Sequence, residues 1–244
     1  MIDLVAAEWL KLRTTRLLYG SIPAAVALSF AAVAGAVLSA DSAAELESTA
    51  GIRDTLSVTG TGAILVLVVG IIISAGEYRH GTAADTFLTT PRRHQVATAK
   101  LTLGATVGLA AGVITSAACV GIATLLYNIE DATFPFGDAE AWAILAGTLA
   151  YTTLFAILGV ALGVLIRNQV LAIAGALAWL AVIEHTLVIL VPDIGRWLPV
   201  AAGQAIVRTN LDDLLSPLAG TAVLTAYAVA IAAAGIRVAA TRDA

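Results

Sequence analysis

The chain has 244 residues, of which 59% are hydrophobic and only 12% are charged, and its formal net charge is −4 at pH 7. Soluble proteins carry about a quarter of charged residues, so a soluble fold of this length would lack the polar surface needed to cover itself. The slightly acidic balance argues against a nucleic-acid partner, which would need a concentrated basic face.

Six runs are apolar enough to cross a bilayer as helices, a crossing that takes about 20 residues. We therefore predict an all-α integral membrane protein with one transmembrane domain over residues 17–244, preceded by a short segment over residues 1–16. The predicted spans are 17–39, 56–75, 101–127, 142–166, 170–191 and 218–238. The first run is longer than the roughly 7–15 residues of a signal-peptide core, which favours an uncleaved span.

The segment before the first span has an amphipathic pattern. Val5, Trp9 and Leu12 recur on one side of a helix, and Glu8 and Lys11 lie roughly opposite. This pattern predicts a helix in the membrane interface, with Trp9 at headgroup depth and basic residues against anionic lipid. A frayed tail is the alternative interpretation.

Basic residues are distributed unequally between alternate loops. With a cytoplasmic N-terminus, that side holds most of them, and Arg53, Arg196 and Arg208 lie on the other side. Because Lys and Arg concentrate in cytoplasmic loops, we expect both termini to be cytoplasmic.

The loop over residues 76–100, between the second and third spans, is the most polar and basic stretch of the chain. Thr82 and Asp85 resemble a capping box that opens a short helix. Pro91 then suits the first position of another helix, which leads into the third span. The spacing therefore predicts a helix, a break and a second helix.

This loop also combines apolar and basic side chains. Phe87 and Leu88 are followed by Arg92 and Arg93. An apolar anchor within a polar rim is typical of a docking surface for another protein. The alternative is a loop whose basic residues only set the topology.

Residues 192–216, between the fifth and sixth spans, are too apolar for a solvated loop and too many for a tight turn. Irregular backbone at membrane depth is tolerated where protein or water satisfies it. We predict short re-entrant or surface helices over the outer face, one after Pro192 and one near Pro199.

Glycines recur at four-residue intervals in two spans. Gly104, Gly108 and Gly112 lie in the third span, and Gly159 and Gly163 in the fourth. Such spacing favours close packing of helices. A sequence rich in Ala and Gly also produces it by chance.

Sequence motifs for catalysis are scarce. The chain lacks a Gly-x-x-x-x-Gly-Lys phosphate loop and a His-Glu-x-x-His zinc motif. The lone Cys119 excludes an internal disulfide and a thiolate metal cluster. We therefore expect neither ATP hydrolysis nor a metal site in this chain.

Glu184 and His185 form an adjacent ionisable pair inside the fifth predicted span. Because a buried charge is costly in a bilayer, such a residue is a candidate functional site. Glu184 has two interpretations: a direct role toward substrate or protons, or a structural role, either as an ion pair for which Arg196 or Arg208 could be the partner or as a water-facing anchor.

The loop over residues 76–100 is similar to the first cytoplasmic loop of type-2 ABC exporter permeases, particularly the short six-span permeases common in actinobacteria. The matching residues are Gly76, Glu77, Tyr78, Arg79, Gly81, Thr82, Leu88, Pro91, Arg92, Arg93, Ala99 and Lys100. Residues 7–16 resemble the amphipathic start of these permeases. Trp179, Glu184 and residues 197–202 resemble their outer re-entrant region.

This resemblance implies an exporter subunit of the bacterial plasma membrane. Two permease copies, identical or related, would enclose a pathway, and each would pair with a separate ATP-binding cassette ATPase that binds ATP and Mg²⁺. The loop would carry the coupling helix, and the start of the chain would form the connecting helix. The implied coupling residues are Glu77, Tyr78, Arg79, Gly81, Thr82, Phe87, Leu88, Pro91, Arg92 and Arg93, and those of the connecting helix are Glu8, Trp9, Lys11 and Arg13.

Two other classes of protein are alternatives to a permease. A membrane immunity or scaffold protein would only sequester a toxin or a partner. An intramembrane enzyme would use Glu184 and His185, but adjacent residues of a helix point about 100 degrees apart rather than toward each other.

Overall fold

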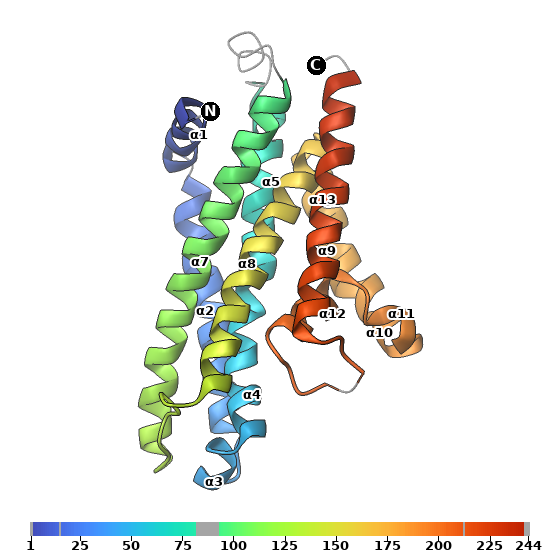
Figure 1. The fold of residues 1–244 in the computed structure, drawn as a ribbon. Coiled ribbons are helices and arrows are strands. Elements are labelled where there is room, and N and C mark those ends of the chain that lie inside the picture. The colour runs from blue at the N-terminus through green and yellow to red at the C-terminus, as the bar shows by residue number, and fades with distance from the viewer. Residues whose placement is uncertain (1, 15, 82–92, 212, 242–244) are drawn as a thin grey trace.

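The computed structural model describes residues 2–14, 16–81, 93–211 and 213–241. Within them, six helical segments are long and apolar enough to cross a membrane, which confirms the all-α, six-span architecture. The segments lie side by side in an elongated bundle (Figure 1). Their bounds are Tyr19–Leu38, Thr49–Arg79, His94–Ile129, Ala139–Ile166, Gln169–Leu190 and Pro217–Val238.

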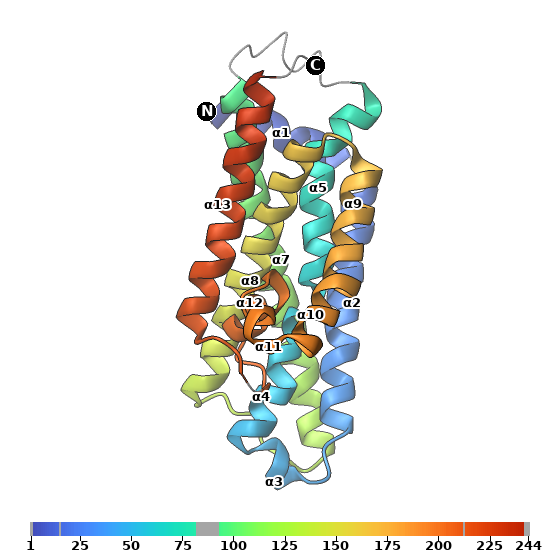
Figure 2. The same cartoon turned by 90° about the vertical axis from the view of Figure 1, so that its right-hand side faces the viewer.

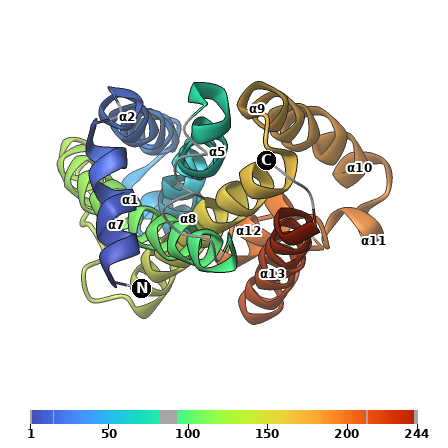
Figure 3. The same ribbon diagram turned by 90° about the horizontal axis from the view of Figure 1, so that it is seen from above.

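The described residues form long and short helical elements, some of which build the spans while others lie before or between them. In chain order these are α1 (Ile2–Thr14), α2 (Arg16–Leu38), α3 (Ala43–Leu46), α4 (Thr49–Ser57), η1 (Val58–Gly62), α5 (Ala63–His80), α7 (Arg93–Ile129), α8 (Ala139–Ile166), α9 (Gln169–Ala178), η2 (Trp179–Glu184), α10 (His185–Leu190), α11 (Pro192–Gly195), α12 (Pro199–Ile206) and α13 (Pro217–Thr241). α5 and α8 pack together at the centre, and α7 and α13 pack against α8 (Figure 3). Leu67, Ile71 and Phe155 are fully buried between the central helices.

Glycines let the central helices approach closely, as their spacing predicts. A Cβ atom on Gly159 would collide with the α5 backbone at Leu67, and one on Gly163 would collide with Ser74. A Cβ atom on any of the predicted glycines of α7 would likewise collide with α8. Those glycines are Gly104, Gly108 and Gly112.

The first described helix and the end of the last one lie at the same end of the bundle. α1, the end of α5, the start of α7 and the end of α13 are all uppermost in Figures 1 and 2. We call this the loop end, since residues 82–92 join α5 to α7 in the sequence. α3 and the connection from α7 to α8 lie at the opposite end (Figure 1). That the loop end is cytoplasmic stays a prediction.

The second span is longer than predicted. Its helical structure begins at Thr49 rather than at residue 56, passes through the 3₁₀ segment η1 and continues into α5. The charge of Arg53 makes this part read as a loop in the sequence. In the fold, Arg53 is bonded to Glu140 of α8, so the helix extends beyond the apolar run.

The fifth span is interrupted near its centre. The π-helix η2 separates α9 from α10, and the short helices α11 and α12 follow. These helices begin at Pro192 and Pro199, where the sequence predicts helix starts. α12 packs against both α13 and α8. Whether α11 and α12 re-enter a bilayer stays a prediction.

Candidate functional site

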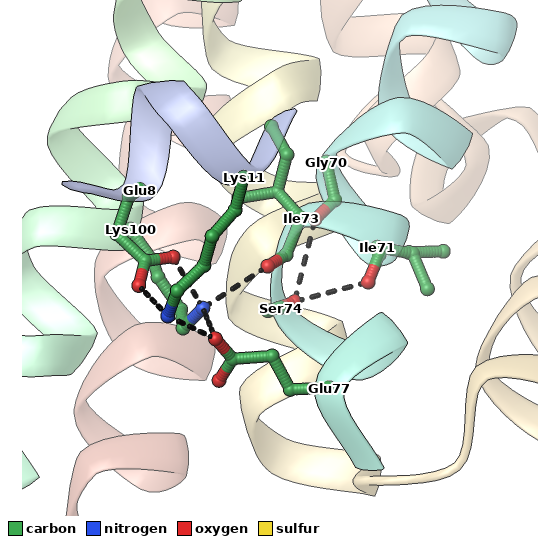
Figure 4. Close-up of polar contacts among 8 residues, drawn as sticks. All are labelled: Glu8, Lys11, Gly70, Ile71, Ile73, Ser74, Glu77 and Lys100. Carbon is green, nitrogen blue, oxygen red and sulfur yellow. Dashed lines mark hydrogen bonds and ion pairs between the residues drawn. The ribbon is translucent and has the colours of Figure 1, made fainter. Parts of the chain in front are cut away.

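Four charged side chains form one cluster at the loop end (Figure 4). Lys100 Nζ donates to Glu8 Oε2 at 2.5 Å and lies 3.2 Å from Glu77 Oε1. Lys11 Nζ donates to Glu8 Oε1 at 2.8 Å and to Glu77 Oε1 at 2.7 Å. The two lysines therefore balance the two carboxylates. We call this set the four-charge cluster.

The four-charge cluster joins three helices that are distant in sequence. Glu8 and Lys11 lie on one face of α1 because they are three residues apart. Glu77 lies in the last turn of α5, and Lys100 lies near the start of α7. α1 is thereby bonded to both helices that flank residues 82–92.

The two buried members of the four-charge cluster, Lys100 and Glu8, need their ion-pair partners to be stable. Lys100 and Glu8 have relative exposures of only 4% and 6%. Lys100 also donates to the carbonyl oxygen of Ile73 at 3.2 Å. A buried charge that loses its partner is strongly destabilising, so these ions hold α1, α5 and α7 in one geometry.

Lys11 is the exposed member of the cluster. Burial lowers the pKa of its ammonium group, but hydrogen bonds and charge from Glu77 and Glu8 outweigh this effect. The pKa of Lys11 therefore lies above its ordinary value, and the side chain is positively charged at neutral pH.

A second set of contacts at the loop end connects α5, α8 and α13. The guanidinium group of Arg167 lies 5.8 Å from the ring centre of Tyr78 and donates to the carbonyl oxygen of Val238 at 2.9 Å. Arg167 ends α8 with a φ of 54°, in the left-handed region that favours glycine. Its side chain thus ties the end of the sixth span to the end of the second.

Half of the predicted coupling residues lie outside the described part of the chain. This holds for Thr82, Phe87, Leu88, Pro91 and Arg92. The capping box and the proline break therefore stay predictions. α7 begins at Arg93, whose side chain is not among those described. Arg79 is exposed, and Gly81 ends α5 with a φ of 69°. At Gly81 that backbone conformation explains the glycine.

The predicted faces of α1 are partly wrong. Leu12, predicted on the membrane-facing side, is buried in the protein, and Glu8, predicted on the opposite side, is buried too and faces the bundle. Trp9 is 44% exposed and Arg13 is exposed. The pattern misplaced Glu8 because it assigns every charge to the solvent side, whereas the lysines of α1 and α7 neutralise this one.

The predicted ion pair of Glu184 with Arg196 or Arg208 is also wrong. Glu184 Oε1 instead accepts hydrogen bonds from the backbone N–H groups of Val200 at 2.5 Å and Ala201 at 3.2 Å. These are orphan donors of the first turn of α12, so Glu184 caps that helix from the fifth span. The two arginines pair with other acids.

Glu184 and His185 do not converge on a site. Glu184 is 1% exposed inside the protein, whereas the side chain of His185 is exposed. A hydrolytic pair would need both groups within hydrogen-bond reach of one reacting atom. This arrangement disfavours an intramembrane enzyme that uses the two residues. Within the described residues, no group of three or more His, Cys, Asp or Glu side chains could hold a metal ion.

The sequence pattern did not show that Glu8, Lys11, Glu77 and Lys100 form one cluster. Each of them lies in a segment singled out for coupling, but their pairing joins residues as far as 92 positions apart. The sequence does show an acidic residue, Glu8, and a basic residue, Lys11, on α1. It also shows an acidic residue at the end of the second span, Glu77, and a basic residue near the start of the third, Lys100.

Comparison with protein families matches residues 4–183 to the model described as ABC-2 family transporter protein. A search of curated proteins finds no match. The matched region is more than half of the chain and includes all members of the four-charge cluster. It ends just before Glu184, so α12 and α13 lie beyond it. The chain thus belongs to the ABC-2 family of transporter proteins and is a multi-pass membrane component of that class.

Proposed function

We propose that this chain is the permease subunit of an ATP-driven exporter and that residues 76–100 couple it to a separate ATP-binding cassette ATPase. The four-charge cluster is the observation that carries this proposal. It bonds α1 to the helices on both sides of residues 82–92, so a push on that segment reaches α1, α5 and α7 together.

The packing of α5 gives this movement a route into the membrane. α5 is the helix most closely packed with α8, through glycines such as Gly159 and Gly163. Close-packed interiors transmit strain rather than absorb it. A displacement of the cluster would therefore shift the central helix pair, as a two-state coupling element requires.

The remaining parts of the proposed assembly follow from the family resemblance. A second permease copy, identical or related, would complete the pathway, and two ATPase subunits would bind ATP and Mg²⁺. The assembly would lie in the bacterial plasma membrane, with the loop end in the cytoplasm. The positive charge of Lys11 and Arg13 at that end supports this orientation.

The test is reconstitution of the chain with its cassette ATPase. We expect Phe87→Ala, Leu88→Ala and Arg92→Ala to reduce co-purification of the ATPase and its stimulation by the permease, because they remove the docking anchor. Phe136→Ala is the matched control, since Phe136 is exposed at the opposite end of the bundle. Unchanged association and stimulation in all three loop variants would refute coupling through this loop.

The same reconstitution separates a permease from a scaffold that only sequesters a partner. If the chain is a permease, it should associate stably with the ATPase, and some compounds should stimulate ATP hydrolysis by the complex. A scaffold requires neither. A compound screen on the wild-type complex, repeated with Phe87→Ala, therefore also addresses the class of cargo.

A further inference from the structure

At the end of the bundle opposite the loop end, two arginines share one carboxylate. Arg53 Nε donates to Glu140 Oε1 at 2.7 Å, and Arg208 Nη1 donates to Glu140 Oε2. Asp54 bonds instead to Asn210 at 2.9 Å. A guanidinium group has five N–H donors, and the three side chains together carry a net charge of about +1. Donors and positive charge thus exceed what Glu140 satisfies.

Both arginines line a pocket of about 270 Å³. They are partly exposed, with side-chain exposures of 40% for Arg53 and 34% for Arg208, so a ligand can reach them. The rest of the lining is mainly apolar and comprises Ala205, Thr209, Leu214, Leu215 and Pro217. A cationic group beside an apolar wall fits an amphiphilic anion.

The pocket lies near the ends of two candidate spans, so we expect it at the depth where helices leave the hydrocarbon. Pro217 is the first residue of the sixth span. Arg53 lies in a span of 31 residues, beyond the about 20 that a crossing needs, so its turn extends into the headgroup region. Trp142, in the first turn of α8, is exposed, as expected of an aromatic belt.

The backbone at Arg208 supports a role for its side chain. Arg208 follows α12 with a φ of 58°, and its N–H donates to Ala205 O while that of Thr209 donates to Gln204 O. This is a Schellman ending, whose left-handed position is usually taken by glycine. Arginine stands at this position instead, and its side chain lines the pocket.

We propose that this pocket binds the phosphate of an anionic phospholipid headgroup, with Arg53 and Arg208 as the donors and the apolar wall against the start of the acyl chains. Arginine forks match phosphate oxygens in geometry. The apolar wall and the depth favour a lipid over a free phosphate ion. The proposal does not depend on ATP-driven transport, so either can fail without the other.

The experiment is a titration of the purified chain, in a neutral detergent, with dihexanoyl phosphatidylglycerol. We expect saturable binding, and no comparable binding of dihexanoyl phosphatidylcholine or inorganic phosphate. Arg53→Gln and Arg208→Gln should each weaken binding about tenfold, the loss of a charged hydrogen bond. If Arg53→Gln does not fold, Arg53→Lys keeps the charge, loses the planar fork and should also weaken binding. Arg196→Gln is the matched control, since Arg196 pairs with Asp193 outside the pocket.

Glu140→Gln separates a binding site from a structural ion triad. This variant removes the competing carboxylate, so phosphatidylglycerol should bind more tightly, although the internal ion pairs are lost. A purely structural triad predicts the opposite, because Glu140→Gln would then harm the protein as the arginine variants do. Weaker binding in Glu140→Gln, or equal binding of phosphatidylcholine or of phosphate, would overturn the proposal.

Discussion

Lys100 illustrates how a single charge can be placed at the edge of a membrane span. Its side chain is nearly inaccessible, yet it has Glu8, Glu77 and the carbonyl oxygen of Ile73 within reach. Such a lysine is tolerated because each of its donors meets an acceptor. The same contacts bring α1 onto the bundle, so one residue serves both solvation and assembly.

Replacing Lys100 should therefore destabilise the protein far more than replacing Lys11, the exposed lysine of the same cluster. We expect Lys100→Met to cost about 3–5 kcal/mol, because buried carboxylates lose their partner. Lys11→Met is the matched control and should cost less than about 1 kcal/mol, since Lys11 is 47% exposed in its side chain. Thermal unfolding in detergent measures both. Equal losses would contradict the assignment, and Glu8→Gln should partly rescue Lys100→Met.

Glu184 has a structural task that its neighbour lacks. Its carboxylate satisfies the backbone N–H groups of Val200 and Ala201, whereas His185 points out of the protein. We expect Glu184→Leu to cost about 1–3 kcal/mol locally, because buried N–H donors lose their acceptor. Hydrogen exchange at the amides of residues 200–206 should become faster, and His185→Leu should leave it unchanged. Unchanged exchange in Glu184→Leu would refute the capping role.

At the scale of elements, the fold depends on how closely α5, α7 and α8 approach. No hydrophobic effect drives apolar helices together in lipid, so association relies on close packing and hydrogen bonds. The glycines on α7 and α8 allow the close packing. A hydrogen bond joins the hydroxyl groups of Thr59 of η1 and Thr148 of α8, which lie 2.7 Å apart. η1 thus joins the two halves of the second span while remaining bonded to α8.

A methyl group at the central contact should force the helices apart. We expect Gly159→Ala to cost about 1–3 kcal/mol, the range for overpacking a close contact. Gly175→Ala is the matched control on α9, where a Cβ atom would meet nothing within 4 Å. That change should be neutral or stabilise by up to about 1 kcal/mol, because alanine favours a helix. Thermal unfolding measures the difference, and identical midpoints would argue against tight packing of α5 on α8.

At the scale of the whole molecule, the bundle has two chemically different ends. The loop end carries the four-charge cluster and the Arg167 contacts, and the opposite end carries the triad of Arg53, Arg208 and Glu140. Both sets join helices that are distant in sequence. Each end is therefore fixed by ion pairs, while the middle is fixed by packing.

The orientation of these ends is testable by thiol labelling. In a Cys119→Ser background, which removes the buried native thiol, we expect Gly137→Cys to react with an impermeant reagent on intact spheroplasts. Thr14→Cys, at the loop end, should react only after permeabilisation. Both positions are exposed, so access differs only by the side of the membrane. Labelling in the reverse order would place the loop end outside the cell.

The six apolar runs and the helix starts at Pro192 and Pro199 could be predicted from the sequence alone, and the spacing of glycines such as Gly159 favoured close helix contacts without excluding chance. These features depend on local runs and periodicities, which a linear pattern records directly. The packing of the helices was needed to show that Glu8 faces inward toward Lys100, that Glu184 caps α12 rather than pairing with an arginine, and that the helical structure of the second span begins at Thr49. A charged group is stabilised by whichever partner the fold brings near, and a linear pattern carries no record of that distance.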